Sequence, residues 1–566
     1  MTSICLPPPV PLPVARTLDE YPPFLQQLLV NRGITTTTAA EQYITPSYDD
    51  HLHDPFLLHD MSEAVERVHA AIAAGETIVI FSDYDCDGIP GAVVLHDFFT
   101  AVSHEAFRVV IPHRHYDGFG LSVTAVEHMV ETGPPDLIIT IDCGTTSVAA
   151  VARARAAGID VIITDHHEPG EQLPDAVAVV NPKVGDTYPF SGLCGAAVVY
   201  KLIQALLATG KYPLPPGQEK WWLDMVGVAT IADMVPLQDE NRVLAHYGLT
   251  VLRKSRRPGL QQLLRKQRVN QQQLTEDDIG FTIGPRINAA SRMDTPEEAF
   301  RMLATKDVAE AGDRVAHLEQ LNNERKVAVA QMTKDLHRRV EVVTELPPVL
   351  VFGNPEWRPS LVGLAANKLA EEHGRPVFLW GRDGNESFKG SCRSGGSVSV
   401  VHLMEAVAHV FTEYGGHHMS GGFTVHESHI HTFGSALIDA HDSLGTAAVV
   451  SSTHAIDAVL SLDEITSAMV ALQRQCAPFG ADNPKPLYLF EGVRPRTVDT
   501  FGKQQEHTKL TFTTSGVVRE AIAFFRLPEQ FTTRPEVDGS VSIVAHIEES
   551  YFMNRHQVRL RIVDIL

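Results

Sequence analysis

Acidic and histidine residues follow three short apolar runs of this 566-residue sequence. The run DYDCDG (83–88) comes after TIVIFS, Asp142 follows LIITI, and DHHE (165–168) follows VIIT. Carboxylates gathered in one cleft repel each other, so they need cations to stay ionised. Oxygen ligands mixed with imidazole suit Mn²⁺ or Mg²⁺. Two such ions sharing an aspartate would activate a water and hold both oxygens of an in-line phosphoryl displacement, so these residues predict a metal-dependent phosphoesterase.

Five apolar runs predict the strands that position these residues. The runs are rich in β-branched residues and are separated by amphipathic segments such as AVEHMVET. This alternation is typical of a parallel sheet in a doubly wound α/β domain. Ligands of such sheets bind beyond the carboxyl ends of the strands, so the three clusters are expected to face one cleft. The expected strands are TIVIF (77–81), FRVVIP (107–112), LIITI (137–141), VIIT (161–164) and AVAVV (176–180).

Each motif alone has a plainer explanation. A lone aspartate at a strand end, such as Asp142, most often caps the next helix. DYDCDG resembles a calcium loop, but no later acidic ligand follows it at the required spacing. His166 and His167 could be ordinary surface residues. Three coincidences at the same end of one sheet make these explanations improbable together. Neither GxGxxG nor GxxxxGK[ST] occurs at these strand–helix turns, which excludes the usual nucleotide-binding sites.

A fourth acid, Asp233, lies among apolar residues in VGVATIADMVPL. An unpaired carboxylate in such surroundings is costly. A salt bridge or coordination of the same metal centre would satisfy it, and the sequence leaves both open.

The composition bounds the class of protein. A chain of this length is expected to form about three or four domains. No run of about 18 apolar residues predicts a membrane span, and the proline-rich N-terminus does not resemble a secretory signal, so we expect a cytoplasmic protein. The six cysteines include no CxxC pair, which argues against a disulfide framework and a structural zinc site. The net charge is −22, yet Arg253–Arg268 carries seven basic residues and no acid. That run is either a phosphate-binding surface or a solvated helix face.

Changes in pattern along the chain predict five parts. The first is helical, the second holds the strands above, and the third has the character of one long helix. A second, smaller α/β region follows, and the last part is rich in short strands that suggest a small barrel such as an OB-fold. The expected boundaries are 1–70, 71–300, 301–343, 344–447 and 448–566.

Several motifs together resemble the DHH phosphoesterases, and within them the RecJ-type exonucleases. The resemblance extends along nearly the whole chain. It implies a DHH domain joined by a long helix to a DHHA1 domain, followed by an OB-fold. It also implies metal-dependent hydrolysis of single-stranded DNA to mononucleotides in the 5′→3′ direction, in DNA recombination and repair. The motifs are DYDCDG, DHH (165–167), ADMVPL (232–237), IPHRHYDGFGLS (111–122), GPRINAASRMD (284–294), GSCRSGG (390–396), GGHHMSGGF (415–423) and PFGADNPKP (478–486).

The same resemblance implies roles for individual residues. Asp142 would bridge two Mn²⁺ or Mg²⁺ ions, and Asp165 would hold the tautomer of a histidine. The metal ligands implied are Asp83, Asp85, Asp87, Asp142, His166 and Asp233. The residues implied to act on the scissile phosphate or in the reaction are Asp142, His167, Arg286, Asn288, Arg292 and His417. A 5′ phosphate would be held by Arg114, Ser391 and Arg393. His418 and, from the basic run, Lys254, Arg256 and Arg257 are further candidates for DNA contacts.

The last part of the chain and three departures from the family pattern complete the expectations. Phe501, His507, Lys509, Phe524 and Phe525 are candidates for binding single strands, with core packing as the plainer explanation for the phenylalanines. The family's Trp-His-Pro-Gly run is replaced by Trp-Arg-Pro-Ser at 357–360, two alanines by Ser420-Gly421, and a glycine by Ser291. None of these positions is an expected metal ligand.

Two other functions compete with this interpretation. One is a DHH enzyme that cleaves short oligonucleotides or cyclic dinucleotides, but the long connector and the C-terminal barrel argue against it. The other is an inactive relative serving as a replication scaffold, yet every expected ligand is present. The expected partners are single-stranded DNA, a single-strand-binding protein and a RecQ-type helicase, with no membrane, and the chain is expected to be a monomer.

Overall fold

The computed structural model describes residues 3–383, 387–396, 398–444, 453–502, 504–552 and 555–566. The chain forms two compact units, which are described separately below. The two-sheet unit comprises residues His53–Val235 and Tyr247–Val450. The barrel unit comprises Met1–Leu52, Pro236–His246 and Ser451–Leu566.

The first sheet of the two-sheet unit is parallel throughout. Its strand order is β3-β2-β4-β5-β6, and every neighbouring pair runs in the same direction. Each of the five expected strands is present, which confirms the doubly wound α/β fold. The central strands are buried on both faces, as their uninterrupted apolar runs require. The strands are β2 (Ile78–Ser82), β3 (Phe107–Val110), β4 (Leu137–Ile141), β5 (Asp160–Thr164) and β6 (Ala178–Val180).

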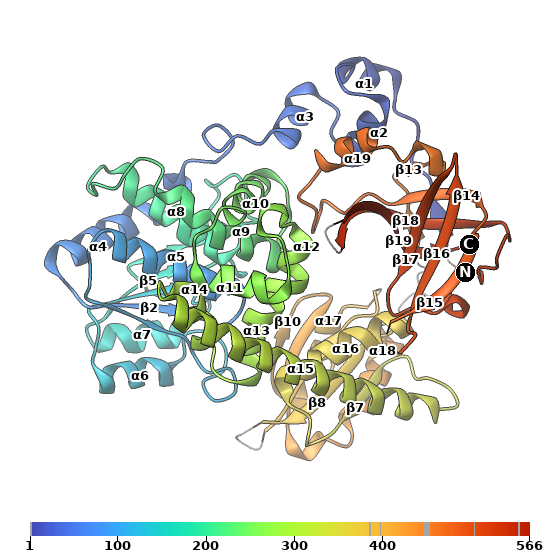
Figure 1. The fold of residues 1–566 in the computed structure, drawn as a ribbon. Coiled ribbons are helices and arrows are strands. Elements are labelled where there is room, and N and C mark those ends of the chain that lie inside the picture. The colour runs from blue at the N-terminus through green and yellow to red at the C-terminus, as the bar shows by residue number, and fades with distance from the viewer. Residues whose placement is uncertain (1–2, 384–386, 397, 445–452, 503, 553–554) are drawn as a thin grey trace. The chain divides into compact units, whose positions relative to one another are not determined.

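Helices cover both faces of this sheet (Figure 1). On one face, α6 (Val123–Thr132) and α7 (Val148–Ala156) pack onto the strands through apolar side chains such as Val126 and Val151. On the other face lie α4 (Met61–Ala74), α5 (Gly88–Ala101) and α8 (Gly195–Ala208). From β2 the chain first adds β3 on one side and then β4 on the other. The carboxyl ends of β2 and β4 are therefore the switch point at which such sheets bind ligands.

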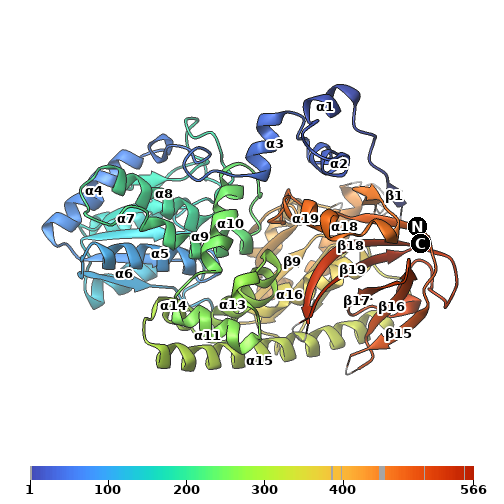
Figure 2. The same cartoon turned by 45° about the horizontal axis from the view of Figure 1, so that its top comes forward.

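A helical region follows the first sheet. Its longest member is α15, which runs along one side of the view in Figure 2. This helix has 34 residues and begins at an Asp307 cap whose side chain accepts a hydrogen bond from the Glu310 amide. This confirms the expected long helix. The others are α9 (Leu223–Ala232), α10 (Asp239–Leu252), α11 (Pro258–Gln267), α13 (Gly284–Met293) and α14 (Glu297–Ala304), with α15 spanning Val308–Glu341.

The second sheet confirms the smaller α/β part. Its strand order is β10-β11-β9-β8-β7, of which only the β7–β8 pair is parallel. Helix α16 (Pro359–His373) buries Leu361, Ala365 and Leu369 in a cluster that also holds the inward side chains of β7 and β8. The strands are β7 (Leu350–Gly353), β8 (Val377–Arg382), β9 (Phe388–Arg393), β10 (Phe411–Gly416) and β11 (Ser420–Val425).

The barrel unit is built on a seven-stranded sheet with the order β13-β14-β18-β19-β17-β16-β15. The strand-rich C-terminal part is thus confirmed. The strands are β13 (Ala458–Val459), β14 (Tyr488–Val493), β15 (Thr497–Phe501), β16 (His507–Thr514), β17 (Val517–Ala523), β18 (Val541–Phe552) and β19 (Arg555–Ile565).

The N-terminal residues belong to this barrel unit, which the sequence did not predict. Leu18, Leu25, Leu28 and Leu29 are buried in the same core cluster as Phe512. Helices α1 (Leu12–Thr17), α2 (Pro23–Asn31) and α3 (Thr37–Ile44) supply this layer, and β1 (Ser3–Cys5) pairs with β12 (Thr453–Ala455). The expected boundary between residues 447 and 448 lies outside the described residues.

No helix in the described ranges is long and apolar enough to cross a membrane.

Candidate metal centre and substrate cleft

The loop after β2 places three aspartates at the end of the strand. The Asp85 carboxylate accepts hydrogen bonds from the amides of Asp87 and Gly88, at 2.8 and 3.2 Å. A Cβ atom at Gly88 would lie 2.4 Å from the Asp83 carbonyl oxygen, so the turn into α5 requires glycine. Asp83 is buried, and its Oδ1 atom has no hydrogen-bond partner.

Asp142 follows β4 in a left-handed backbone conformation, with φ 59°. Its side chain is buried under the start of α8, where a Cβ atom at Gly195 would come within 2.6 Å of the Asp142 Cβ. The same helix start holds Asp87, which accepts hydrogen bonds from the amides of Gly195 and Ala196 at 2.6 and 2.8 Å. An anion is stabilised at this end of a helix by the free amides.

Asp165 supports the histidine pair. It accepts a hydrogen bond from the Thr145 amide at 2.9 Å, and its Oδ1 lies 2.8 Å from Nδ1 of His167. Burial alone would lower the pKa of His167, but Asp165 outweighs burial and raises it. This is the supporting position expected for Asp165, because a carboxylate on one ring nitrogen fixes the other.

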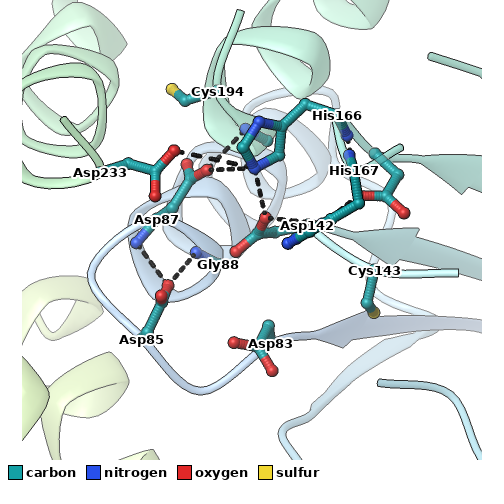
Figure 3. A network of polar contacts seen from close by, with 12 residues as sticks. Asp83, Asp85, Asp87, Gly88, Asp142, Cys143, His166, His167, Cys194 and Asp233 are labelled. Atoms are coloured by element: carbon teal, nitrogen blue, oxygen red, sulfur yellow. Dashed lines mark hydrogen bonds and ion pairs between the residues drawn. The ribbon is translucent and has the colours of Figure 1, made fainter. Parts of the chain in front are cut away.

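His166 lies among three carboxylates (Figure 3). Its Nε2 atom is 3.1 Å from Asp142, 3.6 Å from Asp87 and 3.7 Å from Asp233. Burial, followed by the neighbouring His167, lowers the pKa of His166 to about 4. The ring is therefore neutral at pH 7, which is the form that binds metals. A neutral His166 ring cannot compensate the negative charge of three ionised carboxylates, so this group of residues lacks positive charge.

The buried carboxylates resist ionisation without a cation. Burial and the neighbouring acids raise the pKa of Asp83 and of Asp142 well above its usual range. The same causes raise the pKa of Asp87 to about 7 and that of Asp233 to about 9. A divalent cation removes this cost because it pairs with the charged form.

The carboxylate oxygens and histidine nitrogens of these residues form groups that are compatible with two neighbouring cation sites. Within each of three groups, one ligand atom per residue lies within 4.8 Å of the others. Asp142 belongs to two of the groups, as a bridging residue would, and Asp142 Oδ1 and Asp83 Oδ1 have no hydrogen-bond partner. Carboxylate oxygens and neutral imidazole suit Mn²⁺ or Mg²⁺. The residues thus fit these ions. The groups are Asp83-Asp85-Asp142, Asp87-His166-Asp233 and Asp142-His166-His167.

Arginines expected to hold phosphate lie together near these acids. Burial and then the charges of Arg114, Arg325 and Arg393 lower the pKa of Arg292 to about 9. Burial also lowers the pKa of Arg393, and Arg114 lowers it further. These charges repel one another, and an anion bound among them would relieve the repulsion. The expected residues Arg114, Arg292 and Arg393 are therefore brought together, and Ser391 accepts a 2.9 Å hydrogen bond from Arg393.

A cleft of about 360 Å³ opens beside the arginines. Tyr84, Arg114 and Phe119 line it from the first sheet, and Ser360 and Tyr414 are among its lining residues from the second. The Phe119 side chain is 58% exposed, and its ring meets the His167 ring edge-on at 5.6 Å. Exposed aromatic rings of this kind can stack on bases.

Two hydrogen bonds to one residue, Ser360, hold Arg292 in place. Its guanidinium donates to the Ser360 carbonyl oxygen at 2.5 Å, and the Ser360 hydroxyl donates to the Arg292 carbonyl oxygen at 2.9 Å. Ser360 is one of the departures from the family pattern, so that departure adds a hydrogen bond.

Two arginines expected to contact phosphate have protein partners in the structure. The three donor nitrogens of Arg286 each donate one hydrogen bond, to Glu319, Thr282 and Gln267, at 2.5–2.8 Å. Arg257 is buried and pairs with Asp97 and Asp224 at 2.8 Å each. Sequence does not reveal carboxylate partners that lie far along the chain, which is why phosphate was the expected partner of both arginines. Their role in the fold is to join helices.

The remaining expected residues occupy exposed or half-buried positions. His417 and His418 lie in the turn between β10 and β11 and are exposed, and Asn288 is half-buried on α13. Lys254 and Arg256 are exposed, and Arg256 lies 5.7 Å from the Trp221 ring centre.

In the barrel unit, the aromatic candidates form one cluster rather than part of the core. The His507 ring lies 4.7–5.2 Å from the rings of Phe501, Phe524 and Phe525. Phe525 is 79% exposed, and Arg561 lies 4.1 Å from the Phe524 ring centre. Lys509 is paired with Glu520.

Sequence reasoning missed Tyr84, Phe119, Tyr414 and Arg325. The first three line the cleft, and Arg325 adds charge beside Arg292 while its Nε is buried without a partner. Tyr84 and Phe119 lie inside motifs that had been identified, whereas no motif marks Arg325 or Tyr414.

Comparisons with known proteins agree with this arrangement. Family models match the DHH family N-terminal domain at residues 77–230, the DHHA1 domain at 343–441 and the RecJ OB domain at 456–564. The single-stranded-DNA-specific exonuclease RecJ of Bacillus subtilis (strain 168) is 34% identical over 96% of this chain and 68% of its own length. The protein of the same name from Salmonella typhimurium is 31% identical over 83% of each chain.

A solved structure shares the fold along the whole chain. The crystal structure of RecJ with Mn²⁺ from Thermus thermophilus matches with a TM-score of 0.83 and 26% identity, over 100% of this chain and 79% of that one. RecJ from the same source has also been solved with Mg²⁺, and that structure matches with a TM-score of 0.76 and 24% identity over 100% and 78%. With its sheets, its acidic strand ends and its three matched domains, this chain belongs to the RecJ family of DHH phosphoesterases.

Proposed function

We propose that this chain degrades single-stranded DNA from its 5′ end to mononucleotides, using two divalent cations, in DNA recombination and repair. Membership of the RecJ family makes it a metal-dependent exonuclease specific for single-stranded DNA. The polarity and the product are the new parts of the proposal. The observation that carries them is the arginine cluster of Arg114, Arg292 and Arg393, because it lies beside a cleft next to the acidic strand ends.

Asp83, Asp85 and Asp142 would hold one cation, and Asp87, His166, Asp233 and the shared Asp142 the other. When bound, the ions supply Lewis-acid activation of water and charge stabilisation for an in-line displacement. Hydrogen bonds from backbone amides hold the carboxylates of Asp87 and Asp85 in position to bind these ions. Asp165 orients the His167 ring toward the same centre. His167 would then contact the substrate phosphate.

A terminal phosphate suits the arginine cluster better than an internal one. A 5′ phosphomonoester carries close to two negative charges at pH 7, whereas a phosphodiester carries one. Arg114 and Arg393 would grip that end, with Ser391 at the side and Arg292 nearer the scissile phosphate. Arg offers planar, bidentate contacts to phosphate. Gripping the end one nucleotide from the metal centre would release mononucleotides in the 5′→3′ direction.

Selectivity for single strands would come from aromatic stacking. Phe119 and Tyr414 in the cleft, and the cluster around Phe525 in the barrel unit, offer flat faces to unpaired bases. His417 and His418 on the β10–β11 turn would contact the substrate near the metals. Asn288 would act on the scissile phosphate, and Lys254 and Arg256 would bind phosphate farther along the strand.

Further proposals concern organisation and partners. Functional parts are proposed at 1–70, 71–300, 301–343, 344–447 and 448–566, and the family matches at 77–230, 343–441 and 456–564 support the second, fourth and fifth of them. Because the substrate must be unwound first, a single-strand-binding protein and a RecQ-type helicase are proposed partners. We also propose a monomer in the cytoplasm.

The decisive assay uses long single-stranded DNA labelled at either end, with Mn²⁺, Mg²⁺ or EDTA. The expected result is release of labelled mononucleotide from the 5′ end first, dependent on metal, with blunt duplex resistant. A substrate without a 5′ phosphate should be cut more slowly, because the arginine cluster then loses its dianion.

Three results would contradict the proposal. Release from the 3′ end would exclude the polarity, and cleavage of dinucleotides only would favour the short-oligonucleotide enzymes. Absence of cleavage with any metal despite intact DNA binding would favour the scaffold.

A further inference from the structure

Asp233 is held differently from Asp85 and Asp87 of the metal centre. Asp85 and Asp87 each accept two hydrogen bonds from backbone amides. In the part of the chain that the structure describes, the Asp233 carboxylate contacts no donor except His166, at 3.7 Å. Its position therefore depends on the backbone that carries it, at the end of α9.

The backbone after Asp233 makes an unusual turn. Met234 has a left-handed conformation, with φ 60°, which a side chain of this type rarely adopts. The bodies of the flanking helices are fixed, because α9 and α10 pack closely where Gly227 meets Gly248. The connecting segment between the two helices is not fixed by this packing. We call this segment, Met234–Gln238, the strap.

The strap runs into the barrel unit, to which Pro236–His246 belongs. There the amide of Leu237 donates a 2.9 Å hydrogen bond to the Ala481 carbonyl oxygen. A Cβ atom at Gly480 would lie 2.7 Å from the Leu237 Cδ1 atom, so glycine at position 480 is needed for the Leu237 side chain to pack against this loop. Leu237 is almost fully buried at this point.

The loop that receives Leu237 is itself built rigidly. It belongs to the PFGADNPKP motif (478–486), which no step of the proposed reaction uses. The buried amide of Asn483 donates to the carbonyl oxygens of Cys476 and Pro478, at 3.0 and 2.7 Å. It accepts from Arg32 and Tyr43, at 2.9 and 2.8 Å.

We infer that the PFGADNPKP loop is a positioning element for the metal centre, acting through the strap on Asp233. Gly480 and Leu237 are positioning residues: they touch neither metal nor DNA, but they fix the chain four residues after the ligand. The inference rests on the proposed role of Asp233 as a ligand. The barrel unit then has a second function besides binding single-stranded DNA, because its loop determines how tightly the second cation binds.

Gly480→Ala tests this directly, because the added methyl group displaces Leu237. Mn²⁺ binding to the full-length protein is followed by electron paramagnetic resonance without DNA, and the kcat and KM for single-stranded DNA are measured separately. The weaker of two Mn²⁺ affinities should fall about ten-fold, as when groups supporting a metal ligand are disturbed. The KM for DNA should stay within about two-fold, and excess Mn²⁺ should restore kcat.

A double-mutant cycle with Leu237→Ala isolates the contact. This change removes the atoms that the new methyl group would meet, so Gly480→Ala should cost less than about two-fold in Mn²⁺ affinity in that background. Phe512→Leu is the matched control, since it loosens the barrel core without touching the strap. If Gly480→Ala does not fold, Leu237→Ala alone should weaken the same Mn²⁺ site.

The outcomes separate the possible failures. Unchanged Mn²⁺ affinity in Gly480→Ala, an equal loss in Phe512→Leu, or a full ten-fold loss in the Leu237→Ala background would each overturn the inference. Failure of the wild-type protein to cleave with Mn²⁺ would instead contradict the proposed function, and the binding data would still test the strap.

Discussion

At the scale of single residues, the metal centre is a set of buried charges that the protein cannot balance by itself. Asp142 illustrates this, since it is only 2% exposed and its Oδ1 has no hydrogen-bond partner. His166 approaches it at 3.1 Å but is neutral at pH 7. Burying an unpaired carboxylate costs free energy of folding, and that cost is returned when a cation binds.

Asp142→Asn is expected to abolish cleavage while leaving the affinity for single-stranded DNA nearly intact. It should also raise the melting temperature in EDTA by roughly 1 °C, since about 1 kcal/mol of charge burial is relieved. The increase in melting temperature on adding Mn²⁺ should shrink in the variant. Differential scanning calorimetry with EDTA and with Mn²⁺ measures both effects, and normal cleavage by the variant would show that Asp142 is not at the reaction centre.

The acids of this centre could be predicted from the sequence because each follows directly on a strand. Asp83 and Asp142 share the strand-end position, and the parallel sheet brings such positions together. Arg257 and Arg286 could not be placed in the same way. Their partners Asp97, Asp224 and Glu319 lie 33 or more residues away, and spacing says nothing about such contacts.

At the scale of elements, the start of α8 is the support for two ligands. Its amides bind Asp87, and Gly195 lets the helix approach the backbone of Asp142, whose Cα would lie 2.9 Å from an added Cβ. One helix terminus therefore fixes two ligands that come from different strands. A shift of this terminus should disturb both cation sites together.

Gly195→Ala is expected to reduce Mn²⁺ affinity at least about ten-fold, because α8 must move away from Asp142. Gly312→Ala in α15 is the matched control, since nothing lies within 4 Å of the added methyl group. The control should keep full Mn²⁺ affinity and gain up to about 1 kcal/mol of stability. Isothermal titration with Mn²⁺ and urea unfolding compare the two, and equal affinities would contradict the role of α8.

Arg257 clamps two helices that carry ligands at their other ends. It joins Asp97 on α5 to Asp224 on α9, while Asp87 precedes α5 and Asp233 follows α9. Burial raises the pKa of Asp97, but the hydrogen bond from His96 and the charge of Arg257 outweigh burial and lower it to about 2.

The clamp predicts a pH dependence of stability. Because the pKa of Asp97 is lower in the folded than in the unfolded chain, ionised Asp97 stabilises the fold above about pH 4, and this contribution is lost as the pH falls toward about 2. Asp97→Asn should lower the free energy of unfolding by about 2 kcal/mol at pH 7 and by less at pH 3. Urea unfolding at both pH values measures the difference, and a loss independent of pH would exclude the ion pair as its cause.

At the scale of the whole molecule, the barrel unit is assembled from three separate stretches of chain. The α2 leucines complete a core most of whose other members lie more than 400 residues later. The amphipathic pattern of this helix could be predicted from sequence, but its partner could not. An apolar helix face indicates that the face is covered but does not identify the covering segment. The first sheet is the nearest candidate along the chain, which is why a helical lead-in to that sheet was expected.

Leu29→Ala is expected to destabilise the barrel unit by about 3 kcal/mol, since it removes a fully buried leucine. Amide hydrogen exchange should then accelerate in β16 and β18 and stay unchanged in β2 and β4. Ala39→Gly, on the neighbouring α3, is a helix change outside the buried core and controls for local fraying. Faster exchange in β2 as well would mean that the two units unfold as one.

The pairing of β1 with β12 has a consequence for the order in which the protein matures during synthesis. Residues 3–5 leave the ribosome long before their partner strand, 453–455, which follows only after the whole two-sheet unit has been made. The two-sheet unit can fold on emergence, whereas α2 must wait with its leucines uncovered. Residues 3–5 and the α2 leucines are thus translated early but are among the last to reach their native contacts, because most of those contacts lie after residue 450.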